Sequence, residues 1–542
     1  MKEQQTSVLI VGGGVGGCAA ALAVAQAGQH AILTEECDWI GGQLTSQAVP
    51  PDEHGWIERF GCTASYRCFR NGVRGYYRRH YPLTDAAKNN PRLNPGNGWV
   101  SPLCHEPRVA LAVLYEMLAP YLSNGQITLL TDHRPIKAEV DGDRVRAVTL
   151  RNLRSGAECT VTAKYFLDAT ELGDLLPLTG CEYVTGFEAQ IETDEPSAPA
   201  EAQPRNVQAF SMCFAMEHRA GEDHTIAPPA SYSFWHDYLP QLQPAWPGKL
   251  LSWTITHPRL MTPHIYHFHP HHEPSQAFAG LWTYRRILDR ANFSAGAYAS
   301  DISLMNVPML DYLLGDLTEA DESTRARHIQ QARELSLSFF YWLQTEAPRP
   351  DGGTGWPGLR LRGDVTGTTD GLAKMPYIRE SRRIKAEFTI REQHVAESCR
   401  PGQRYAEAFA DSVGIGYYRI DLHPSTGGNN YLDVGSLPFQ IPLGALIPVR
   451  LENLLPACKN IGTTHITNGC YRLHPVEWNI GEAAGNLAAF CLSQQHTPHQ
   501  TYTNLQTRAA FQHTLERRGI ELAWPQDLVL AEGDPHIHAM PS

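Results

Sequence analysis

The N-terminal part of the chain alternates between short hydrophobic runs and glycine. Residues 7–11 form a β-branched and aliphatic run, which ends at a glycine-rich segment, residues 12–17. An alanine-rich stretch follows through residue 25, and a second aliphatic run covers residues 31–34. Because a hydrophobic run stops at glycines and an apolar stretch follows, the pattern predicts a strand, a tight turn and a helix, and then a second strand.

Three later segments also have patterns that predict regular secondary structure. Residues 132–150 read as two strands joined by an Asp-Gly-Asp turn, which predicts a hairpin, and a further strand leads into Asp168. Near the C-terminus, Pro475 suits the first position of a helix. The apolar face of this helix comprises Val476, Ile480, Ala483, Ala484, Leu487 and Ala488.

Residues 417–423 alternate between two kinds of side chain. Successive side chains of a strand point to opposite faces, so one face of this segment would be polar. That face would carry Tyr417, Arg419, Asp421 and His423. It offers a hydroxyl, a cation, an acid and a base, and it suits the lining of a cavity. Any half-buried edge strand shows the same alternation, so that alternative stays open.

The N-terminal glycines have the spacing of a dinucleotide-binding turn. Gly12, Gly14 and Gly17 form a GxGxxG pattern, in which the glycines allow a tight turn, close approach of a pyrophosphate and close packing of helix on strand. Glu35 ends the second strand at about the separation expected for the acid that binds a ribose hydroxyl. The segment therefore predicts a Rossmann-type unit that holds a dinucleotide, with the helix N-terminus facing the phosphates.

Length and charge exclude several classes of partner. The 542 residues are enough for two lobes or one large composite domain. The net charge of -12 comes without a long basic run, so neither nucleic acid nor an anionic membrane is an expected partner. The glycines at 12–17 would break the apolar region of a secretory signal, and no other stretch is long and apolar enough to span a bilayer. We therefore expect a soluble, cytoplasmic protein.

The cysteines and histidines do not indicate a metal site. Twelve cysteines are scattered without a CxxC pair or zinc-type spacing, which is typical of reduced and mostly buried thiols. Residues 257–272 are dense in histidine, but the prolines among them predict an irregular loop without the spacing that fixes a coordination geometry. We assign no metal.

A second glycine turn narrows the choice of cofactor. Gly41, Gly42 and Gln43 follow Glu35 in a segment that resembles the E-x5-GG extension of FAD-dependent oxidoreductases with the glutathione-reductase-type nucleotide fold. Two later blocks match the same pattern, residues 165–175 and the region from residue 453 onward. From about residue 7 to 492 the chain thus resembles the broad FAD-dependent oxidoreductase family that is similar to the fumarate reductase and succinate dehydrogenase flavoproteins.

The resemblance implies an α/β fold with a discontinuous, Rossmann-like FAD-binding domain in residues 1–200 and 425–495. An α+β substrate domain would be inserted in residues 201–424, and residues 496–542 would form a C-terminal extension. Non-covalent FAD is the default, with the helix after Pro475 pointing its free N–H groups at the reduced flavin. Beyond the N-terminal glycines and Glu35, the implied FAD contacts are Gly41, Gly42, Gln43, Ala169, Thr170, Asp174, Gly462, Asn479 and Gly481. Glu171 stands where relatives usually have glycine.

Four residues are candidates for the chemistry on the substrate. His423 is the first choice for the base that deprotonates the substrate as hydride leaves for the flavin. Arg382 lies in a segment that resembles an arginine-rich motif of the family, and it suits either an anion clamp or an interdomain salt bridge. His54 follows the second glycine turn and is either a second acid–base group or a hydrogen-bonded loop histidine, and His474 precedes Pro475.

We therefore expect an FAD-dependent dehydrogenase or oxidase that removes hydride from a polar small molecule and passes electrons to an acceptor that the sequence does not identify. A second GxGxxG turn after a strand is missing, which disfavours a built-in NAD(P)H domain. Two alternatives stay open. One is a flavin-dependent reductase of an activated C=C bond, in which an arginine donates the proton or clamps the anion. The other is a non-catalytic, FAD-holding partner subunit of a complex.

Overall fold

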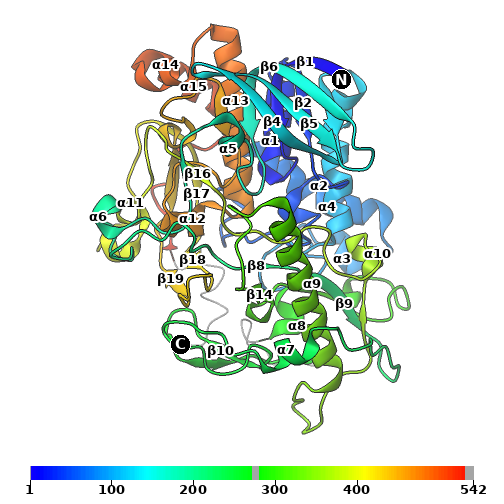
Figure 1. Ribbon diagram of the computed structural model, residues 1–542. Helices are drawn as coiled ribbons and strands as arrows, with labels where there is room; N and C mark the ends of the chain where they lie inside the picture. Colours follow the sequence, from blue (N-terminus) through cyan, green and yellow to red (C-terminus); the bar gives the residue numbers. More distant parts are fainter. Residues whose placement is uncertain (1, 271–279, 531–542) are drawn as a thin grey trace.

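A computed structural model of the chain describes residues 2–270 and 280–530. Its largest sheet has seven strands in the order β3-β2-β1-β6-β5-β4, with β21 beside β6. The strands are β1 (Lys2–Val11), β2 (Ala31–Thr34), β3 (Ile127–Leu130), β4 (His133–Asp141), β5 (Arg144–Asn152), β6 (Glu158–Asp168) and β21 (Leu454–Pro456). Figure 1 shows this sheet at the top of the view. The expected α/β fold class is confirmed.

The centre of the sheet is parallel. β1 pairs in parallel with β2 and β6, β2 with β3, and β21 with the end of β6. β4 and β5 form the predicted hairpin and extend the sheet in antiparallel fashion. The C-terminal part of the chain therefore returns to complete a sheet that the N-terminal part begins.

The register of the parallel strands brings four strand ends to one edge. Val11 lies opposite both Thr34 and Asp168, and Pro456 lies opposite Asp168. Because the strands run in the same direction, the segments that leave them meet beyond their carboxyl ends, where open α/β sheets bind their ligands.

Two helices pack closely on this sheet and on each other. α1 (Val15–Gln26) follows the glycine turn, and α13 (His474–Gln494) comes from the C-terminal part of the chain. A Cβ atom on Gly481 would lie 2.0 Å from the carbonyl oxygen of Gly16, so this crossing needs glycine on α13. α2 (Ala64–His80) and α4 (Pro107–Ser123) pack against each other, and α14 (Pro498–Thr503) and α15 (Leu505–Arg517) pack on α13.

A second hydrophobic core lies in the lower half of Figure 1. It is built around a four-stranded antiparallel sheet of β12 (Arg286–Leu288), β13 (Ile302–Met305), β9 (Phe214–His218) and β15 (Leu359–Leu361). α9 (Glu322–Thr345) buries Leu335, Phe339 and Phe340 in this core. The short strands β8 (Phe210–Ser211) and β14 (Asp311–Tyr312) pair beside it.

The remaining elements are short. They are α3 (Asp85–Asn89), α5 (Leu175–Thr179), α6 (Gln190–Thr193), α7 (Tyr232–Asp237), α8 (Leu281–Tyr284), α10 (Gly363–Thr366), α11 (Glu392–Val395), α12 (His465–Tyr471), β7 (Tyr183–Val184), β10 (Thr254–Thr256), β11 (Pro263–Ile265), β16 (Arg383–Ile384), β17 (Ser412–Gly416), β18 (Ile420–Leu422), β19 (Leu432–Val434) and β20 (Phe439–Pro442). Among the described residues, no helix has the length and apolar character that crossing a membrane requires.

The prediction of one strand over residues 417–423 is wrong in its extent. Only Ile420–Leu422 is a strand, and within it the alternation holds, since Ile420 and Leu422 are buried in the core. The chain before it is irregular, so Tyr417 does not share a face with Arg419. Tyr417 packs on Trp56 instead, with ring centroids 5.1 Å apart.

Candidate functional site

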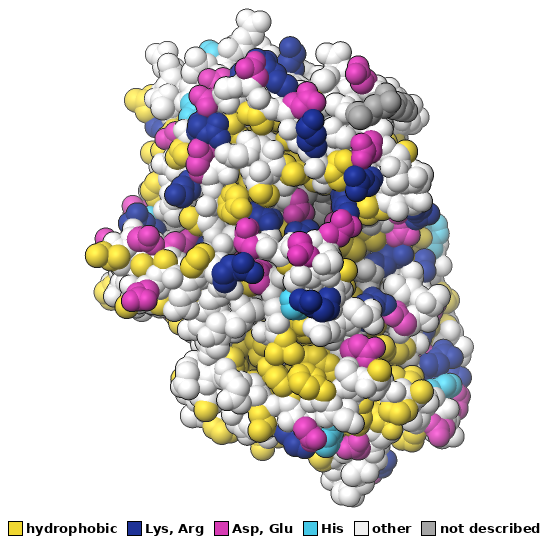
Figure 2. Space-filling model, viewed as in Figure 1, with side chains coloured by type: hydrophobic (Ala, Val, Ile, Leu, Met, Phe, Trp, Pro, Cys, Tyr) yellow, Lys and Arg dark blue, Asp and Glu magenta, His cyan; other side chains and the backbone are white. Residues whose placement is uncertain are grey.

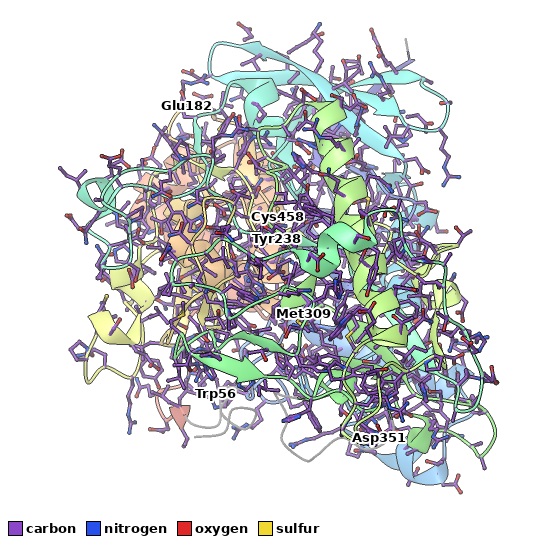
Figure 3. All side chains as sticks on the ribbon, turned by 60° about the horizontal axis from the view of Figure 1, so that its bottom comes forward. Trp56, Glu182, Tyr238, Met309, Asp351 and Cys458 are labelled. Carbon is purple, nitrogen blue, oxygen red and sulfur yellow. The ribbon has the colours of Figure 1, made fainter. Side chains whose placement is uncertain are left out.

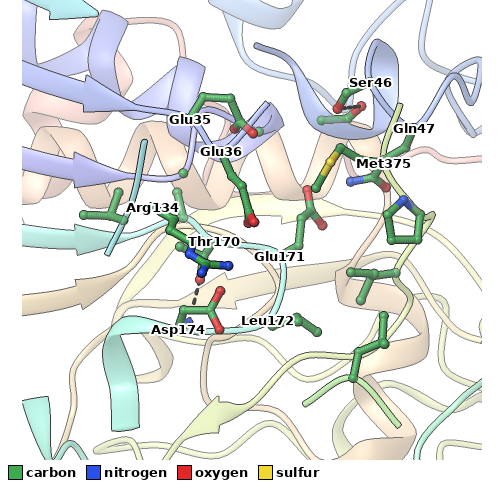
Figure 4. Close-up of a pocket in the computed structure, with 18 of the residues that line it drawn as sticks. Glu35, Glu36, Ser46, Gln47, Arg134, Thr170, Glu171, Leu172, Asp174 and Met375 are labelled. Atoms are coloured by element: carbon green, nitrogen blue, oxygen red, sulfur yellow. Dashed lines mark hydrogen bonds between the residues drawn. The ribbon is translucent and has the colours of Figure 1, made fainter. Parts of the chain in front are cut away.

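A pocket opens at the edge of the sheet where the parallel strands end. It encloses about 780 Å³ of space, counting its opening to solvent, and the segments after β1, β2 and β6 line it. Figure 4 shows Glu36 and Glu171 extending into this pocket, with Arg134 and Asp174 beside them. On the surface, charged side chains of both signs gather in the middle of the face shown in Figure 2. Seven predicted cofactor residues line the pocket: Gly12, Gly14, Glu35, Gly42, Ala169, Thr170 and Asp174.

The glycine turn is shaped so that a cofactor can approach its backbone. Gly12 has a φ of 100°, and a Cβ atom there would lie 2.2 Å from the carbonyl oxygen of Ala169. A Cβ on Gly17 would lie 1.9 Å from the carbonyl oxygen of Gly12. The turn thus needs glycine for both its conformation and its packing, and it directs the N-terminus of α1 to the pocket edge, as a pyrophosphate requires.

Glu35 stands at the end of β2 as predicted. Its carboxylate accepts hydrogen bonds from the N–H of Gly13 at 2.7 Å and the N–H of Cys37 at 2.9 Å. Burial raises the pKa of Glu35 to about 8, although these two hydrogen bonds oppose the shift. The acid is therefore fixed beside the turn, where a ribose hydroxyl of a dinucleotide would reach it.

Two buried charged groups, Lys459 and Glu477, and the partly buried Glu171 lie beside the glycine turns, and none of them was predicted as a cofactor contact. Lys459 forms an ion pair with Glu171, and Glu477 on the first turn of α13 accepts a hydrogen bond from Gln43 at 2.7 Å. The N–H of Gly16 also donates to Glu477, at 3.4 Å. Although burial opposes it, the charge of Glu171 raises the pKa of Lys459, so its ammonium group stays protonated.

Two chain segments separate this pocket from a second cavity. Met375, Pro376 and Ile378 line the first pocket, whereas Tyr377 and Arg379 line the second cavity. The residues of this segment thus alternate between the two spaces. Likewise, Ser46 and Gln47 line the first pocket, and a few residues later Asp52 lines the second. The two spaces therefore lie side by side along shared walls.

The second cavity has two adjoining lobes of about 630 and 270 Å³, counting their openings. Five residues line both lobes: Arg285, Asn306, Tyr418, Asp421 and His423. Tyr266, Tyr284, Tyr431, Arg419 and Asp433 complete the larger lobe, while Asp52, Tyr377, Arg379 and Arg472 contribute to the smaller one. The lining is rich in tyrosine, arginine and aspartate and suits a polar molecule.

His423 is held in this cavity by a buried aspartate. Its Nδ1 lies 2.6 Å from Oδ2 of Asp311, which is 2% exposed and sits on β14. Asp311 Oδ1 accepts a hydrogen bond from Ser211 at 2.9 Å and forms an ion pair with Arg379 at 3.1 Å. Although burial opposes it, the charge of Arg379 and the hydrogen bonds from His423 and Ser211 hold the pKa of Asp311 below its usual value. The ionised carboxylate fixes the imidazole so that Nδ1 carries a proton and Nε2 is left to act as the base.

Two further arginines tie the cavity to both parts of the chain. Arg285 pairs with Asp52 at 3.2 Å. Arg472 donates to the hydroxyl of Tyr377 at 3.1 Å and to the carbonyl oxygen of Asp421 at 3.0 Å. Each arginine is thus positioned by partners from a distant segment, which makes the cavity wall rigid.

His474 begins α13 next to this cavity. Its Nδ1 accepts a hydrogen bond from the N–H of Asp52 at 3.1 Å, so the neutral ring carries its proton on Nε2. Burial lowers the pKa of His474 to about 4. The preceding residue, Leu473, lines the smaller lobe, so the N-terminus of α13 lies at the cavity wall. A neutral histidine there donates a hydrogen bond more readily than it accepts a proton.

His54 lies in a separate aromatic cluster formed with Trp56, Tyr417 and Trp524. Its Nε2 lies 3.0 Å from the carbonyl oxygen of Gly61, and burial lowers its pKa to about 4. Figure 3 shows Trp56 well apart from Cys458, which neighbours Lys459. This environment matches the hydrogen-bonded loop histidine rather than a group that faces either cavity.

Arg382 joins the two halves of the molecule. It donates to the carbonyl oxygen of Leu172 at 2.8 Å and pairs with Glu319 at 2.9 Å and with Asp174 at 3.4 Å. It also donates to the carbonyl oxygen of Thr318. These contacts form a salt bridge between segments that are far apart in the sequence, which is the structural one of the two roles considered for Arg382. Its neighbour Arg379, three residues earlier in the same arginine-rich segment, lines the second cavity.

The other predicted cofactor residues lie around the pocket rather than in its lining. The N–H of Gly41 donates to the carbonyl oxygen of Gly13 at 2.7 Å, and Gln43 donates to the carbonyl oxygen of Arg472 at 3.0 Å. Gly462 packs against Ala386 and Phe388, and Asn479 bonds the backbone of β17. Gly481 serves the crossing of α1 and α13.

Sequence reasoning missed several residues of the two sites. Asp311, Arg285 and Asn306 stand in segments without a chemical motif, and only the fold brings them together. The sequence does contain a signal for Glu477, because this acid lies on the first turn of the helix that was predicted to face the flavin. Within the described part of the chain, no group of three or more His, Cys, Asp or Glu side chains could hold a metal ion. His271 and His272 lie outside the described residues.

Comparisons with known proteins show which family the chain resembles. A family model described as FAD dependent oxidoreductase matches residues 7–515. Similar solved structures include the L-proline dehydrogenase from P.horikoshii, with 16% identity over 35% of this chain and 25% of that chain and a TM-score of 0.18. The rebeccamycin biosynthetic enzyme RebC has 18% identity over 40% of this chain and 39% of that one, with a TM-score of 0.23.

The flavin-dependent monooxygenase PieE has 16% identity over 40% of this chain and 36% of that one, with a TM-score of 0.23. The chain thus spans two fifths or less of the length of these three structures. A comparison with curated proteins gave no match.

Proposed function

The chain belongs to the FAD-dependent oxidoreductase family, and from that premise we propose that it is a dehydrogenase or oxidase that takes hydride from a polar, hydroxyl-bearing small molecule. FAD is its cofactor. The observation that carries this proposal is the pair of His423 and Asp311 in a polar cavity that shares two walls with the FAD pocket.

The FAD pocket supports this arrangement because its residues fit a dinucleotide. The glycine turn would hold the pyrophosphate and Glu35 a ribose hydroxyl. We propose that the flavin end lies toward Gln47 and Met375, against the shared walls, with the N-terminus of α13 nearby. The partial positive charge of that helix end would then favour the reduced cofactor.

We also propose the domain division that the sequence suggested. Residues 1–200 and 425–495 would hold FAD in a glutathione-reductase-type fold like that of the fumarate reductase flavoproteins, and residues 201–424 would bind the substrate. The pairing of β21 with β6 supports this division. The second cavity draws Asp52 and Arg472 from the first unit and Arg285 and His423 from the second, so substrate would bind between the two.

Residues of this chain would handle the proton of the reaction. FAD supplies the hydride acceptor when it is bound. As a substrate alcohol carbon loses hydride, its hydroxyl group loses a proton to Nε2 of His423, and the product is a carbonyl compound. Asp311 stabilises the imidazolium that forms, and Arg379 keeps Asp311 ionised. The positive charge on the imidazole would therefore form beside a carboxylate that is already ionised and held in place by Arg379 and Ser211.

The lining of the cavity supports a polar substrate. The hydroxyl of Tyr431 has no hydrogen-bond partner among the described residues, and its ring lies 5.5 Å from that of His423. Buried polar groups in folded proteins are almost always paired, so a hydroxyl in this position indicates a polar ligand group. The arginines of the wall add donors for further oxygen atoms.

An anaerobic screen tests the proposal. The purified holoenzyme would be mixed with a panel of hydroxylated and carboxylated small molecules, and flavin absorbance would be followed. We expect at least one alcohol to bleach the flavin without any other reagent. Reoxidation of pre-reduced flavin by compounds with an activated C=C bond would instead support the reductase. A flavin that responds to neither class would support the non-catalytic partner subunit.

A further inference from the structure

Lys459 and Glu171 are brought together by the register of the sheet. Pro456 ends β21 and Asp168 ends β6, and these two residues are register partners. Lys459 and Glu171 each follow three residues later, at the strand edge where the FAD pocket opens. The Nζ of Lys459 pairs with Oε2 of Glu171, and their side chains are 1% and 22% exposed.

The carboxylate of Glu171 lies against both glycine turns. A Cβ atom added to Gly14 would lie 3.2 Å from Oε1 of Glu171, and a Cβ atom added to Gly42 would lie 2.9 Å from the same oxygen. Glu477 reaches the same turn, where it accepts from the N–H of Gly16. Free N–H groups at such a turn bind the pyrophosphate of a dinucleotide. Two carboxylates therefore stand where this pyrophosphate would be held, and one of them, Glu171, is paired with the ammonium group of Lys459.

The charges that face the pocket are unbalanced. Lining or adjoining acids are Glu35, Glu36, Glu171, Asp174 and Glu477, and the bases are Arg134, Arg325 and Lys459, with His133 also in the lining. The two arginines already have partners, Arg134 in Glu322 outside the pocket and Arg325 in Asp174, which Arg382 also contacts. A pyrophosphate adds further negative charge to a pocket in which acids already outnumber bases, so the charge on Lys459 matters to its binding.

We propose that Lys459 is a counter-ion for the pyrophosphate of FAD, and that Glu171 competes with the pyrophosphate for this ammonium group. The pair would then set the affinity for FAD, and the acids around the turn would set the dependence of that affinity on pH. The glycine at the position of Glu171 in relatives has no side chain that could compete, so this chain would hold its cofactor less tightly than its glycine turns alone allow.

The sign of the pH dependence follows from the acids around the turn. Burial raises the pKa of Glu35 to about 8, and burial also raises that of Glu477 against the opposing charge of Lys459. A pyrophosphate placed beside these carboxyl groups makes their protonated forms still more favourable. FAD binding would therefore take up protons, and affinity would fall as the pH rises.

Equilibrium dialysis of the holoenzyme, with free FAD measured by its fluorescence, tests the proposal. We expect Glu171→Gln to raise FAD affinity roughly tenfold at about pH 8, and Lys459→Met to lower it by roughly the same factor or more. Competition by ADP should change by the same factors, because ADP carries the pyrophosphate. Competition by adenosine, which lacks phosphate, should not change.

A matched control and a double variant separate the effect of the Lys459–Glu171 pair from a general loss of negative charge. Glu182→Gln removes the same charge from an ion pair with Arg450, at a site that Figure 3 shows apart from Cys458, and it should leave FAD affinity unchanged. In the double variant Glu171→Gln/Lys459→Met no ammonium group is left to compete for, so Glu171→Gln should raise FAD affinity much less in the Lys459→Met background than in the wild type. A full tenfold gain from Glu171→Gln in the Lys459→Met background, or an equal gain from Glu182→Gln, would overturn the proposal.

Discussion

The FAD pocket and the second cavity are built from the same chain in different ways. In the FAD pocket, Gly12, Gly14 and Glu35 lie within one strand, turn, helix and strand unit, so their spacing in sequence is fixed by local geometry. In the second cavity, His423 and Asp311 are 112 residues apart and meet only because β14 and the segment after β18 are folded together. A site that local geometry forms can therefore be recognised from residue spacing in the sequence, whereas a site that long-range packing forms cannot.

The two sites also differ in electrostatics. Burial raises the pKa of Glu35 to about 8 and that of Asp168 to about 7 at the FAD pocket. At the second cavity, the charge of Arg379 and the hydrogen bonds from His423 and Ser211 outweigh burial and hold the pKa of Asp311 low. The first site therefore favours protonated carboxyl groups, whereas the second keeps an ionised carboxylate beside an imidazole, as a proton acceptor needs.

Replacement of Gly12 has the largest expected effect and tests the local site. Gly12→Ala should abolish FAD retention, leaving roughly a tenth or less of the wild-type flavin content, because the left-handed backbone and the close carbonyl oxygen of Ala169 both oppose a Cβ. Gly28→Ala is the control, since Gly28 also has a positive φ but nothing lies within 4 Å of its added Cβ. Flavin absorbance relative to protein measures the result. Equal flavin loss in both variants would assign the effect to backbone strain alone.

Arg382 joins the segment after β6 to the segment before α9, and its replacement tests how far this link stabilises the protein. Arg382→Gln should destabilise the protein by about 3 kcal/mol, because it leaves Glu319 without its arginine and the carbonyl oxygens of Leu172 and Thr318 without their donor. Once folded, the variant should retain its rate of flavin reduction. Thermal unfolding and stopped-flow reduction measure the two quantities separately.

The opposite pattern for Arg382, unchanged stability with a lost rate, would make this residue an anion clamp at the substrate instead.

How far the sequence can predict the molecule follows from this contrast. The N-terminal unit, the hairpin of β4 and β5 and the helix α13 were predicted because hydrophobic period and turn residues specify them locally. Residues 417–419 were predicted as strand because polar and apolar side chains alternate there, yet they are irregular in the structure. The position of Tyr417 is explained by its packing on Trp56, a residue that is distant in the sequence. Asp311 gave no signal at all, because its role depends on a partner more than a hundred residues away.

Asp311 is a positioning residue, and its replacement tests the long-range site. Asp311→Asn should lower kcat by roughly ten- to a hundredfold and change KM little, because the imidazole loses the carboxylate that orients and stabilises it. Ser211→Ala removes another hydrogen bond of Asp311 without touching His423 and should keep kcat within a few fold of wild type. A larger change in KM than in kcat for Asp311→Asn would indicate a role in substrate binding or cavity shape.

The smallest expected effect is a pH dependence of stability that the FAD pocket causes. A carboxyl group whose pKa is raised on folding stabilises the native state below its unfolded pKa, and this contribution is lost as the pH rises through the folded pKa. Glu35 and Asp168 should therefore lower stability between about pH 6.5 and 8. His54, His105 and His474, with pKa values lowered to about 4, act in the opposite direction, but only below about pH 6.5.

The melting temperature should thus fall by a few degrees over this range, and by less in Glu35→Gln. Glu452→Gln, which removes an acid from a partly exposed ion pair with Arg144, is the control and should follow the wild type. A melting temperature that rises with pH over the same range would show that the carboxyl groups of the FAD pocket are ionised in the folded protein.

In the mechanism that we propose, His423 accepts the substrate proton in a cavity beside the flavin. This role is tested by the anaerobic rate of flavin reduction in His423→Gln, with the alcohol that bleaches the wild-type flavin. We expect full FAD content and a rate lowered by roughly 10²- to 10⁴-fold. Reduction at the wild-type rate by a variant that retains its FAD would contradict it.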